Sequence, residues 1–519
     1  MSRARRSIDL VRTAATERLL LRDSARLKLV GVVAAGLLLP LAYAPFGWFV
    51  LAPACYAVLF YAWTNSSPRQ AALHGFAFGL ASFLAGMYWI FISVHEFGRA
   101  PIALAALLTL ALVAVLSVFP ALAGWAAARW FVTTGPWAWL GVLPAVWVLT
   151  EWCRGWVFSG LGWLAAGYSQ ADSWLIGYAP VGGIYLMSWA VLATAGVLVT
   201  LGSGPRRARW AALLAAAAIW VPAKFLSEHR WTQPDSEIVT VALAQGAVSQ
   251  DLKWQPDQLL PTLELYRDLT TAALGSALIL WPEAAIPAAY GQVQRYLDQV
   301  DQLSRARGST VLLGILRENP DTGAIQNALV ALGATPQFYV KRHLVPFGEY
   351  FPVPQVVRGW LRRLELPYSD IEPGPPAQAP LTVGAQRLGV TICYEDLFGA
   401  EQLHYIPAAT LLVNVSNDAW FGRSIAPHQH LQIARIRAAE AGRYMLRATN
   451  TGVSAIIDPS GRLIARSPQF EPHLLKGAVQ GFTGTTPYAW WGNYAVVLAA
   501  LLVLVGQGAM TKFTMRFAT

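Results

Sequence analysis

The chain has 519 residues, of which 55% are hydrophobic and 13% are charged, and its formal net charge is +10. It is too long for one ordinary domain, and its repeated apolar runs of about 20 residues indicate transmembrane helices. The basic residues argue against nucleic-acid binding, because many lie at the N-terminus and in short loops between apolar runs, where positive charge fixes membrane orientation.

The N-terminal segment 1–28 is basic, with eight Arg or Lys and three acidic residues before an apolar run begins. A cleavable signal peptide is the competing interpretation, but this basic region is long and no clear A-x-A cleavage site follows it. We therefore expect a retained first helix. Cys55 and Cys153 lie in or beside apolar runs, and with Cys393 they make no even set that predicts a disulfide framework.

The apolar runs predict a helical membrane domain with about eight transmembrane helices. The expected spans lie at about 27–44, 48–64, 72–94, 101–128, 136–151, 174–202, 209–226 and 489–507. The turn signal Ala44-Pro45-Phe46-Gly47 separates the first two spans into a helical hairpin.

The charges of the short loops predict the orientation in the membrane. The basic residues that mark the inner side, besides the leader, are Arg69, Arg129, Arg206, Arg207, Arg209, Lys512 and Arg516. The outer loops are balanced, with Glu96 against Arg99 and Glu151 against Arg154. This asymmetry places both termini in the cytoplasm. We expect a leader and seven-helix membrane domain over 1–226, an outer domain over 227–487, and a last transmembrane helix with a cytoplasmic tail over 488–519.

The segment 227–487 alternates between strand and helix patterns, which predicts an α/β domain with buried central strands. The predicted strands are Ile238–Ala244, Ala277–Trp281, Thr310–Leu316, Asn327–Leu332, Phe338–Lys341, Leu388–Cys393, Thr410–Val415 and Val453–Ile457. The predicted helices are 254–274, 291–306 and 428–447. Residues 351–382 break this rhythm with Pro and Gly, and two interpretations stay open: a surface loop, or an amphipathic lid that touches the membrane.

One cysteine of this segment is a candidate nucleophile. Cys393 follows a predicted strand, and its thiol needs a base or a nearby cation because a free thiol is mostly protonated at neutral pH. Glu283 follows an apolar strand and can accept the thiol proton. Lys341 ends another strand and can stabilise the thiolate and the oxyanion of an acyl reaction. The three residues therefore form a candidate catalytic set.

Three stretches around these residues carry a family resemblance. They are Trp281-Pro282-Glu283, the run Y-x-K-x-H-L-V-P-F-G-E-Y from Tyr339 to Tyr350, and Ile392-Cys393-Tyr394-Glu395-Asp396. In this order they are similar to the nitrilase (carbon–nitrogen hydrolase) superfamily. The second run, with the flanking membrane helices, resembles the apolipoprotein N-acyltransferase branch. Further runs that fit this branch are Gln245 with Leu252-Lys253-Trp254, Asn414–Phe421 and Arg447–Gly452. One departure is Gly160-Leu161-Gly162-Trp163, where the family tends to have G-F-P-W.

The resemblance implies an αββα sandwich domain on the periplasmic side of a bacterial inner membrane. Glu283 would be the general base, Lys341 the oxyanion-stabilising cation and Cys393 the nucleophile. The resemblance also assigns supporting or substrate-binding roles to Trp254, Glu349, Tyr394 and Glu395. Cys393 would take an acyl chain from a phospholipid as a thioester, and the α-amine of a diacylglyceryl-cysteine apolipoprotein would then attack it, as the final step of lipoprotein maturation. We expect no cofactor and no metal, and the oligomeric state is not predicted.

Other functions compete with this one. A membrane-anchored amidase that acts on a small amide would use the same three residues, although the long apolar half argues against it. A catalytically inactive scaffold that binds lipoproteins is disfavoured by the intact set. A Cys–His pair or a zinc site at His428 and His430 lacks its fold context or a third ligand, so helix capping or surface solvation is expected for these histidines. Glu151 and Arg154 fit either a lipid head-group site or mutual pairing.

Overall fold

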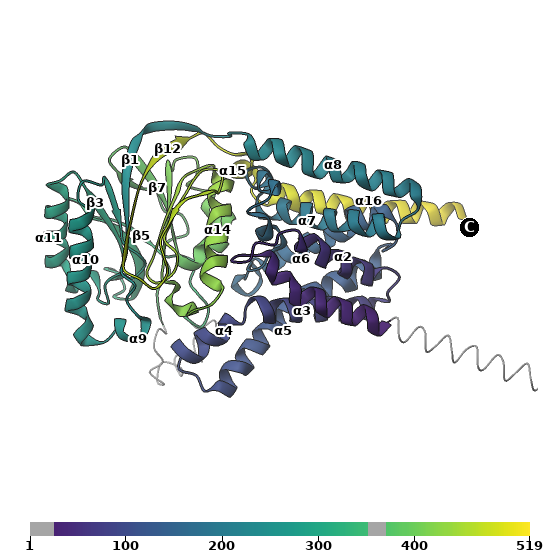
Figure 1. Ribbon diagram of the computed structural model, residues 1–519, viewed down its shortest axis with the longest axis horizontal. Coiled ribbons are helices and arrows are strands. Elements are labelled where there is room, and N and C mark those ends of the chain that lie inside the picture. Colours follow the sequence, from purple (N-terminus) through teal and green to yellow (C-terminus); the bar gives the residue numbers. More distant parts are fainter. Residues whose placement is uncertain (1–24, 351–369, 519) are drawn as a thin grey trace, which may run out of the picture.

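The computed structural model describes residues 25–350 and 370–518, and these form a helical part beside a sheet-rich part (Figure 1). The helical part contains a helix at Ala25–Ala42, α2 (Leu51–Trp63), α3 (Pro68–Gly86), α4 (Trp89–Ile92), α5 (Ile102–Trp130), α6 (Leu143–Arg154), α7 (Ala179–Ser203), α8 (Arg206–Glu228) and α16 (Tyr494–Ala518). Residues 1–24 of the basic leader and the segment 351–369 of the expected loop or lid lie outside the described residues.

The predicted count of eight transmembrane spans is not confirmed. Within the described chain, four helices are long and apolar enough to cross a membrane: Ala25–Ala42, Ile102–Trp130, Trp174–Ser203 and Arg206–Glu228. A fifth span is possible if α3 and the segment Trp89–Phe97 count as one, although they are bent by 54°. Helix α2 and the apolar stretch Tyr494–Gly508 are shorter than a full span.

Glycine residues allow close contact between α3 and α5. A Cβ at Gly75 would lie 2.1 Å from the Pro120 carbonyl oxygen, and one at Gly124 would lie 2.4 Å from the Ala71 carbonyl oxygen. Small residues let helix backbones approach this closely, so van der Waals contact between the two backbones stabilises the pair α3 and α5.

Helix α7 is broken near its beginning by two glycines. Gly183 has φ of 63° and ψ of −162°, a conformation that only glycine adopts readily. The second half of α7 starts after this break, and the amide of Ile184 donates to the Glu440 carboxylate of the sheet-rich part at 2.9 Å. A carboxylate at a helix N-terminus is favourable because it satisfies a free amide and faces the positive end of the helix dipole.

Two six-stranded sheets make up the sheet-rich part of the described chain. Their orders are β12-β1-β2-β3-β4-β5 and β11-β10-β9-β8-β7-β6. The strands are β1 (Gln233–Gln245), β2 (Leu278–Leu280), β3 (Thr310–Glu318), β4 (Ile325–Ala331), β5 (Gln337–Val340), β6 (Leu381–Val383), β7 (Gln386–Ile392), β8 (Leu411–Ser416), β9 (Met445–Thr449), β10 (Ala455–Ile457), β11 (Leu463–Arg466) and β12 (His473–Thr483). β1–β3 are parallel, as are β7–β9, so polar residues that follow these strands gather at one edge of each sheet.

The eight predicted strands are all present, but four observed strands were not predicted: β6, β9, β11 and β12. The predicted helix 428–447 is too long, since α14 (Ala426–Ala441) ends where Gly442 takes a left-handed conformation with φ of 61°. A glycine at this position ends a helix because it adopts positive φ without a Cβ clash. The chain then turns into β9, which the helical pattern had obscured.

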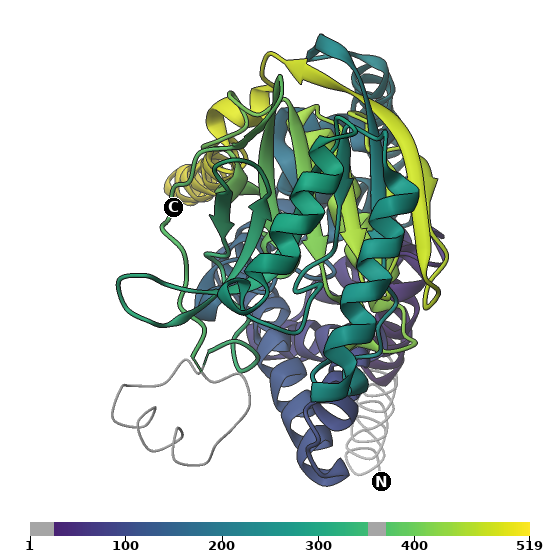
Figure 2. The ribbon, with the colours of Figure 1, turned by 90° about the vertical axis from the view of Figure 1, so that its left-hand side faces the viewer.

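The two sheets and their helices form the predicted αββα sandwich. Helices α10 (Leu259–Ala273) and α11 (Gln294–Arg305) cover the outer face of the first sheet, as Figure 2 shows. Apolar residues of both sheets, among them Leu329 and Val413, fill the space between them. Helix α14 covers the second sheet and faces the helical part (Figure 1). Its Ile433 and Ile436 belong to one continuous core with the membrane helices.

Candidate active site

A glycine in β3 makes room for Glu283. The chain after β2 continues to pair with β3, since Trp281 N donates to Leu312 O at 2.8 Å and Ala285 N donates to Gly314 O at 2.8 Å. A Cβ at Gly314 would lie 2.5 Å from the Glu283 Cα. The absence of a side chain at Gly314 thus lets Glu283 sit tightly over the end of the neighbouring strand.

The carboxylate of Glu283 is buried, with 6% exposure, and accepts three hydrogen bonds. Its Oε1 accepts from Asn327 Nδ2 at 2.7 Å and from Lys341 Nζ at 3.2 Å. Its Oε2 accepts from the backbone amide of Asn417 at 2.8 Å. Donors from three separate loops or strands therefore fix the orientation of the candidate base.

Lys341 lies directly after β5 and is held between two carboxylates. Its backbone amide donates to Asn327 O at 2.8 Å, and its Nζ also donates to Glu349 Oε1 at 2.9 Å. Burial alone lowers the pKa of Lys341, but the charges of Glu283 and Glu349 outweigh it and raise this pKa well above its ordinary value. The side chain is therefore a permanent cation inside the site.

Cys393 begins a sharp turn at the end of β7. Its φ is 51°, a left-handed conformation that is strained for a residue with a side chain. Two acidic side chains fold back on the strand end and hold this turn. Glu395 Oε2 accepts from the Ile392 amide at 2.7 Å, and Asp396 Oδ1 accepts from the Thr391 hydroxyl at 2.7 Å. The turn places Cys393 directly after the last residue of β7.

The surroundings of Cys393 favour the protonated thiol. Burial raises the pKa of Cys393 well above its ordinary value, the charge of Glu283 raises it further, and the charge of Lys341 lowers it only in part. A raised pKa disfavours a preformed thiolate, so a base that removes the proton as the sulfur attacks assists the reaction. The structure brings the three predicted residues into mutual electrostatic contact, with Glu283 as the carboxylate that acts most strongly on the thiol.

Glu349 and Glu395 both build the site from within. Glu349 accepts from Lys341 and Asn327 with Oε1, and from the Val345 amide with Oε2 at 2.8 Å. Glu395 is 2% exposed, and its Oε1 accepts from the Arg342 amide at 2.9 Å. Burial raises the pKa of Glu395 despite these backbone donors. Its contacts join the turn of Cys393 to the loop that follows β5.

Tyr394 follows Cys393 directly, and Trp254 follows a short helix that is connected to Asn417. The Tyr394 hydroxyl donates to the Gly160 carbonyl of the membrane domain, and its ring lies edge-on to His343, 5.6 Å between centroids. Trp254 follows the short helix α9 (Gln250–Lys253) and is 39% exposed. Gln250 at the start of α9 accepts from Asn417 Nδ2 at 2.9 Å. This bond connects the helix to the residue whose backbone amide binds Glu283.

A segment of the membrane domain lies directly against the turn of Cys393. His343 Nε2 is 3.0 Å from the Ser159 carbonyl oxygen, and the Trp163 indole donates to Gln429 Oε1 at 2.7 Å. Phe158 in the same segment is 85% exposed with φ of 55°. Gly162, where the family tends to have proline, has only the Leu397 carbonyl oxygen near an added Cβ, at 4.0 Å. The segment that carries this departure still contacts the residues after β7, through the bond from Tyr394 to the Gly160 carbonyl.

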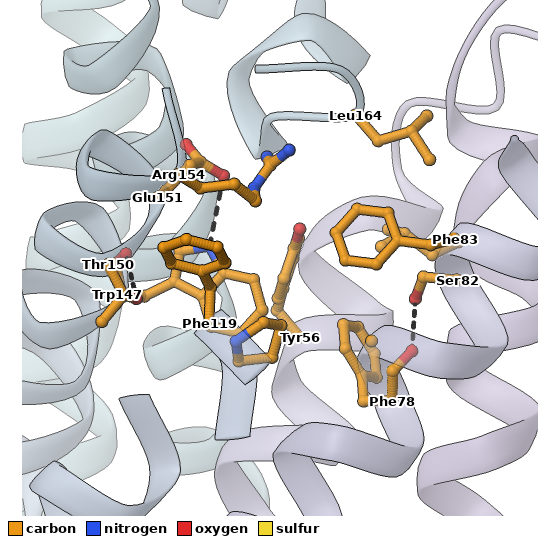
Figure 3. Close-up of a pocket in the computed structure, with 13 residues that line it drawn as sticks. Tyr56, Phe78, Ser82, Phe83, Phe119, Trp147, Thr150, Glu151, Arg154 and Leu164 are labelled. Atoms are coloured by element: carbon orange, nitrogen blue, oxygen red, sulfur yellow. Dashed lines mark hydrogen bonds between the residues drawn. The ribbon is translucent and has the colours of Figure 1, made fainter. Parts of the chain in front are cut away.

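Glu151 and Arg154 do not form an ion pair with each other. Figure 3 shows both beside a cavity of about 20 Å³ among aromatic side chains of the membrane domain, room for about one water molecule. Glu151 accepts from the Ser188 hydroxyl and from the Ala166 amide at 2.9 Å. Arg154 donates to the carbonyl oxygens of Leu161 and Trp163. Each of them therefore anchors the segment that contacts the turn of Cys393.

Several polar residues of the site were not predicted from the sequence. Asn327 and Asn417 orient Glu283. The only sequence signals for them were an asparagine inside a buried strand, for Asn327, and a polar run after an apolar strand, for Asn417. Lys253 is 1% exposed, and burial lowers its pKa to about 8 against the opposing charge of Glu283.

Among residues 25–350 and 370–518, no group of three His, Cys, Asp or Glu side chains is arranged to hold a metal ion.

Comparison with known proteins assigns the family. A model described as the apolipoprotein N-acyltransferase N-terminal domain matches residues 35–197, and one described as carbon–nitrogen hydrolase matches residues 240–488. A protein of Methylococcus capsulatus named apolipoprotein N-acyltransferase is 46% identical over 89% of this chain and 92% of its own length. The chain belongs to the apolipoprotein N-acyltransferase family. Relatives with the same name from Nitrosomonas europaea and Azotobacter vinelandii are 42% and 41% identical, over 95% and 91% of this chain and 99% and 93% of their own lengths.

Proposed function

We propose that this chain N-acylates the α-amine of the diacylglyceryl-cysteine of apolipoproteins, with a phospholipid as the acyl donor and a thioester on Cys393 as the intermediate. The observation that carries the proposal is the joining of a buried Glu283, Lys341 and Cys393 directly against a membrane segment at Ser159 and Gly160. A nucleophile at this place meets lipid acyl groups without drawing them through water. The family membership and the names of the relatives support the same reaction.

In the first half-reaction Glu283 takes the thiol proton while the sulfur attacks the ester carbonyl of the phospholipid. The negative charge that develops on the carbonyl oxygen is stabilised by Lys341, whose cation is already in place and needs no reorganisation. The tetrahedral species then expels the lysophospholipid alcohol, which takes the proton back from Glu283. Cys393 is left as a thioester.

In the second half-reaction the neutral α-amine of the apolipoprotein attacks the thioester. Glu283 accepts the proton that the amine loses and returns it to the departing sulfur, so an amide forms and the free thiol is restored. A thioester reacts with amines more readily than an ester does, which divides a difficult ester-to-amide transfer into two easier steps. Tyr394 and Trp254 would contact the substrates, Glu395 holds the turn of Cys393 from within, and Glu349 keeps Lys341 charged.

The arrangement of the domains supports the predicted orientation. We propose a membrane domain over 1–226, a periplasmic catalytic domain over 227–487, and a last helix with a cytoplasmic tail over 488–519. The helix Ala25–Ala42 begins, and α16 ends, at the end of the helical part remote from the sheets (Figure 1). Helix α8, whose first turn is basic in sequence, also begins at this end. Positive loops at one end favour that end as the cytoplasmic side.

Intact mass measurement tests the reaction directly. The full chain in detergent micelles is incubated first with a defined phospholipid, and a diacylglyceryl-cysteine peptide is then added. We expect a mass increase of one acyl group on Cys393, followed by its transfer to the peptide α-amine. The C393A variant is expected to do neither. Acylation of the peptide by C393A would contradict the proposed nucleophile.

The amidase alternative is not favoured by the comparisons, because the matched relatives carry the acyltransferase name over nearly their whole length. The same preparation separates the two activities. Release of ammonia from small amides, without acyl transfer to the peptide, would replace the proposal with an amidase.

A further inference from the structure

His430 is buried behind the turn of Cys393, contrary to the expectation of helix capping or surface solvation. It lies in the first turns of α14 and is 1% exposed. Its Nδ1 is 2.9 Å from Asp418 Oδ1, and its Nε2 is 3.3 Å from the carbonyl oxygen of Cys393. The ring therefore connects a buried carboxylate to the backbone of the nucleophile and not to its sulfur.

The partners of His430 are both hydrogen-bond acceptors. Burial alone raises the pKa of Asp418, but the charges of Arg447 and His430 outweigh it and hold this pKa well below its ordinary value. Asp418 is therefore an acceptor only, as is the Cys393 carbonyl. The imidazole of His430 therefore lies between two acceptors. Arg447 Nη2 also donates to Asp418 Oδ2 at 2.9 Å, so Asp418 is fixed from behind.

Aromatic rings fix the plane of the imidazole. The ring of His430 lies 5.6 Å from that of Trp163 and 6.2 Å from that of Phe421, centroid to centroid. Trp89 of α4 packs on both, at 4.9 Å from Trp163 and 4.8 Å from Phe421. Two of these rings come from the membrane domain. The imidazole thus has little freedom to leave the Cys393 carbonyl.

We propose that His430 is a positioning residue for the nucleophile: held at Nδ1 by Asp418, it binds the Cys393 carbonyl through Nε2 and so maintains the left-handed backbone that presents the thiol. Without this donor the strained turn relaxes toward an ordinary conformation and the sulfur moves away from Glu283. The proposal rests on Cys393 being the nucleophile, and it deepens the proposed function by naming what orients it.

Three variants of the full chain in micelles test this role. H430F keeps a ring in the aromatic cluster but removes both ring nitrogens, and H430Q restores one N–H. H428F is the matched control, because His428 is on the same helix and only partly buried. Two readouts are used: the rate of alkylation of Cys393 by iodoacetamide, which needs no acyl donor, and the kcat and KM of thioester formation from phospholipid.

We expect H430F to slow both reactions by about 10- to 100-fold, the effect of losing one charge-assisted hydrogen bond, with an unchanged KM for phospholipid. H430Q is expected to recover at least part of this loss, and H428F to match the wild type. Alkylation and kcat within about twofold of wild type in H430F would overturn the proposal. So would H430Q performing no better than H430F, since packing alone would then explain the loss. If alkylation depends on His430 while the wild type forms no thioester, the proposed function fails and the positioning role stands.

Discussion

Replacing Lys253 with methionine is expected to stabilise the folded protein at neutral pH. Lys253 is 1% exposed, and its Nζ has no hydrogen-bond partner among the residues that the structure describes. Burial lowers its pKa from the ordinary 10.5 to about 8, against the opposing charge of Glu283. Because one pKa unit corresponds to about 1.4 kcal/mol, the charged lysine costs the folded state about 3 kcal/mol.

The sign of the pH dependence follows from the lowered pKa. Below pH 8 the lysine is protonated in the folded and unfolded states, and the full cost applies. Between pH 8 and 10.5 the unfolded chain binds more protons than the folded one, so the free energy of unfolding rises with pH. K253M carries no such charge. Its advantage is therefore expected to be about 3 kcal/mol near neutral pH and to shrink as the pH rises through this window.

Thermal unfolding of the full chain in detergent micelles measures this difference. At about pH 6.5 we expect the Tm of K253M to exceed that of the wild type by on the order of 5 °C, and at about pH 9.5 by clearly less. K476M is the control, because Lys476 is exposed and its replacement is expected to change little. A K253M protein that melts below the wild type at the lower pH would refute the reasoning. So would an advantage that is equal at both values.

Three further substitutions test the geometry of the site. G314A would place a methyl group 2.5 Å from the Glu283 Cα. We expect the rate of thioester formation, measured by intact mass, to fall about 100-fold. A near-normal rate would mean that β3 does not fix Glu283. E349Q would turn an amide N–H toward Asn327, Lys341 or the Val345 amide, all of which donate to Glu349. We expect a fall in Tm equivalent to about 2 kcal/mol. An unchanged Tm would contradict these contacts. Y394F removes the hydroxyl bonded to Gly160; we expect a rise of about fivefold in the KM for phospholipid, and an effect on kcat alone would argue against it.

The sequence predicted those parts of the site whose chemistry is visible in single residues. Glu283, Lys341 and Cys393 each follow an apolar strand, and strand ends are easy to recognise from pattern. The residues that orient them were harder, because their roles depend on non-local contacts. Asn327 is one polar side chain in a buried strand, and His430 is an ordinary helix residue until the fold places it behind Cys393.

The fold was predicted where hydrophobic pattern alone decides it. Buried strands such as β3 and β8 are continuous apolar runs, and the structure confirms them. The edge strand β11 alternates between partly exposed and exposed residues, so it carries no apolar signal. Strand β9 follows α14 after only Gly442 to Tyr444, which let the helix pattern run into it. Each expected span falls on a separate helix, but apolar composition does not report helix length, so the number of helices that cross the membrane is not confirmed.

The shared core of α14 and the membrane helices limits how far this enzyme can be separated into modules. Cutting out residues 227–487 would expose Ile433 and Ile436 to water and leave the Glu440 carboxylate without the Ile184 amide at the break of α7. A soluble catalytic fragment therefore requires a redesigned outer face of α14, and truncation alone is expected to yield an aggregating product. For the same reason, substitutions in α14 and α7 are expected to arise as compensating pairs, so that the two halves evolve as one unit.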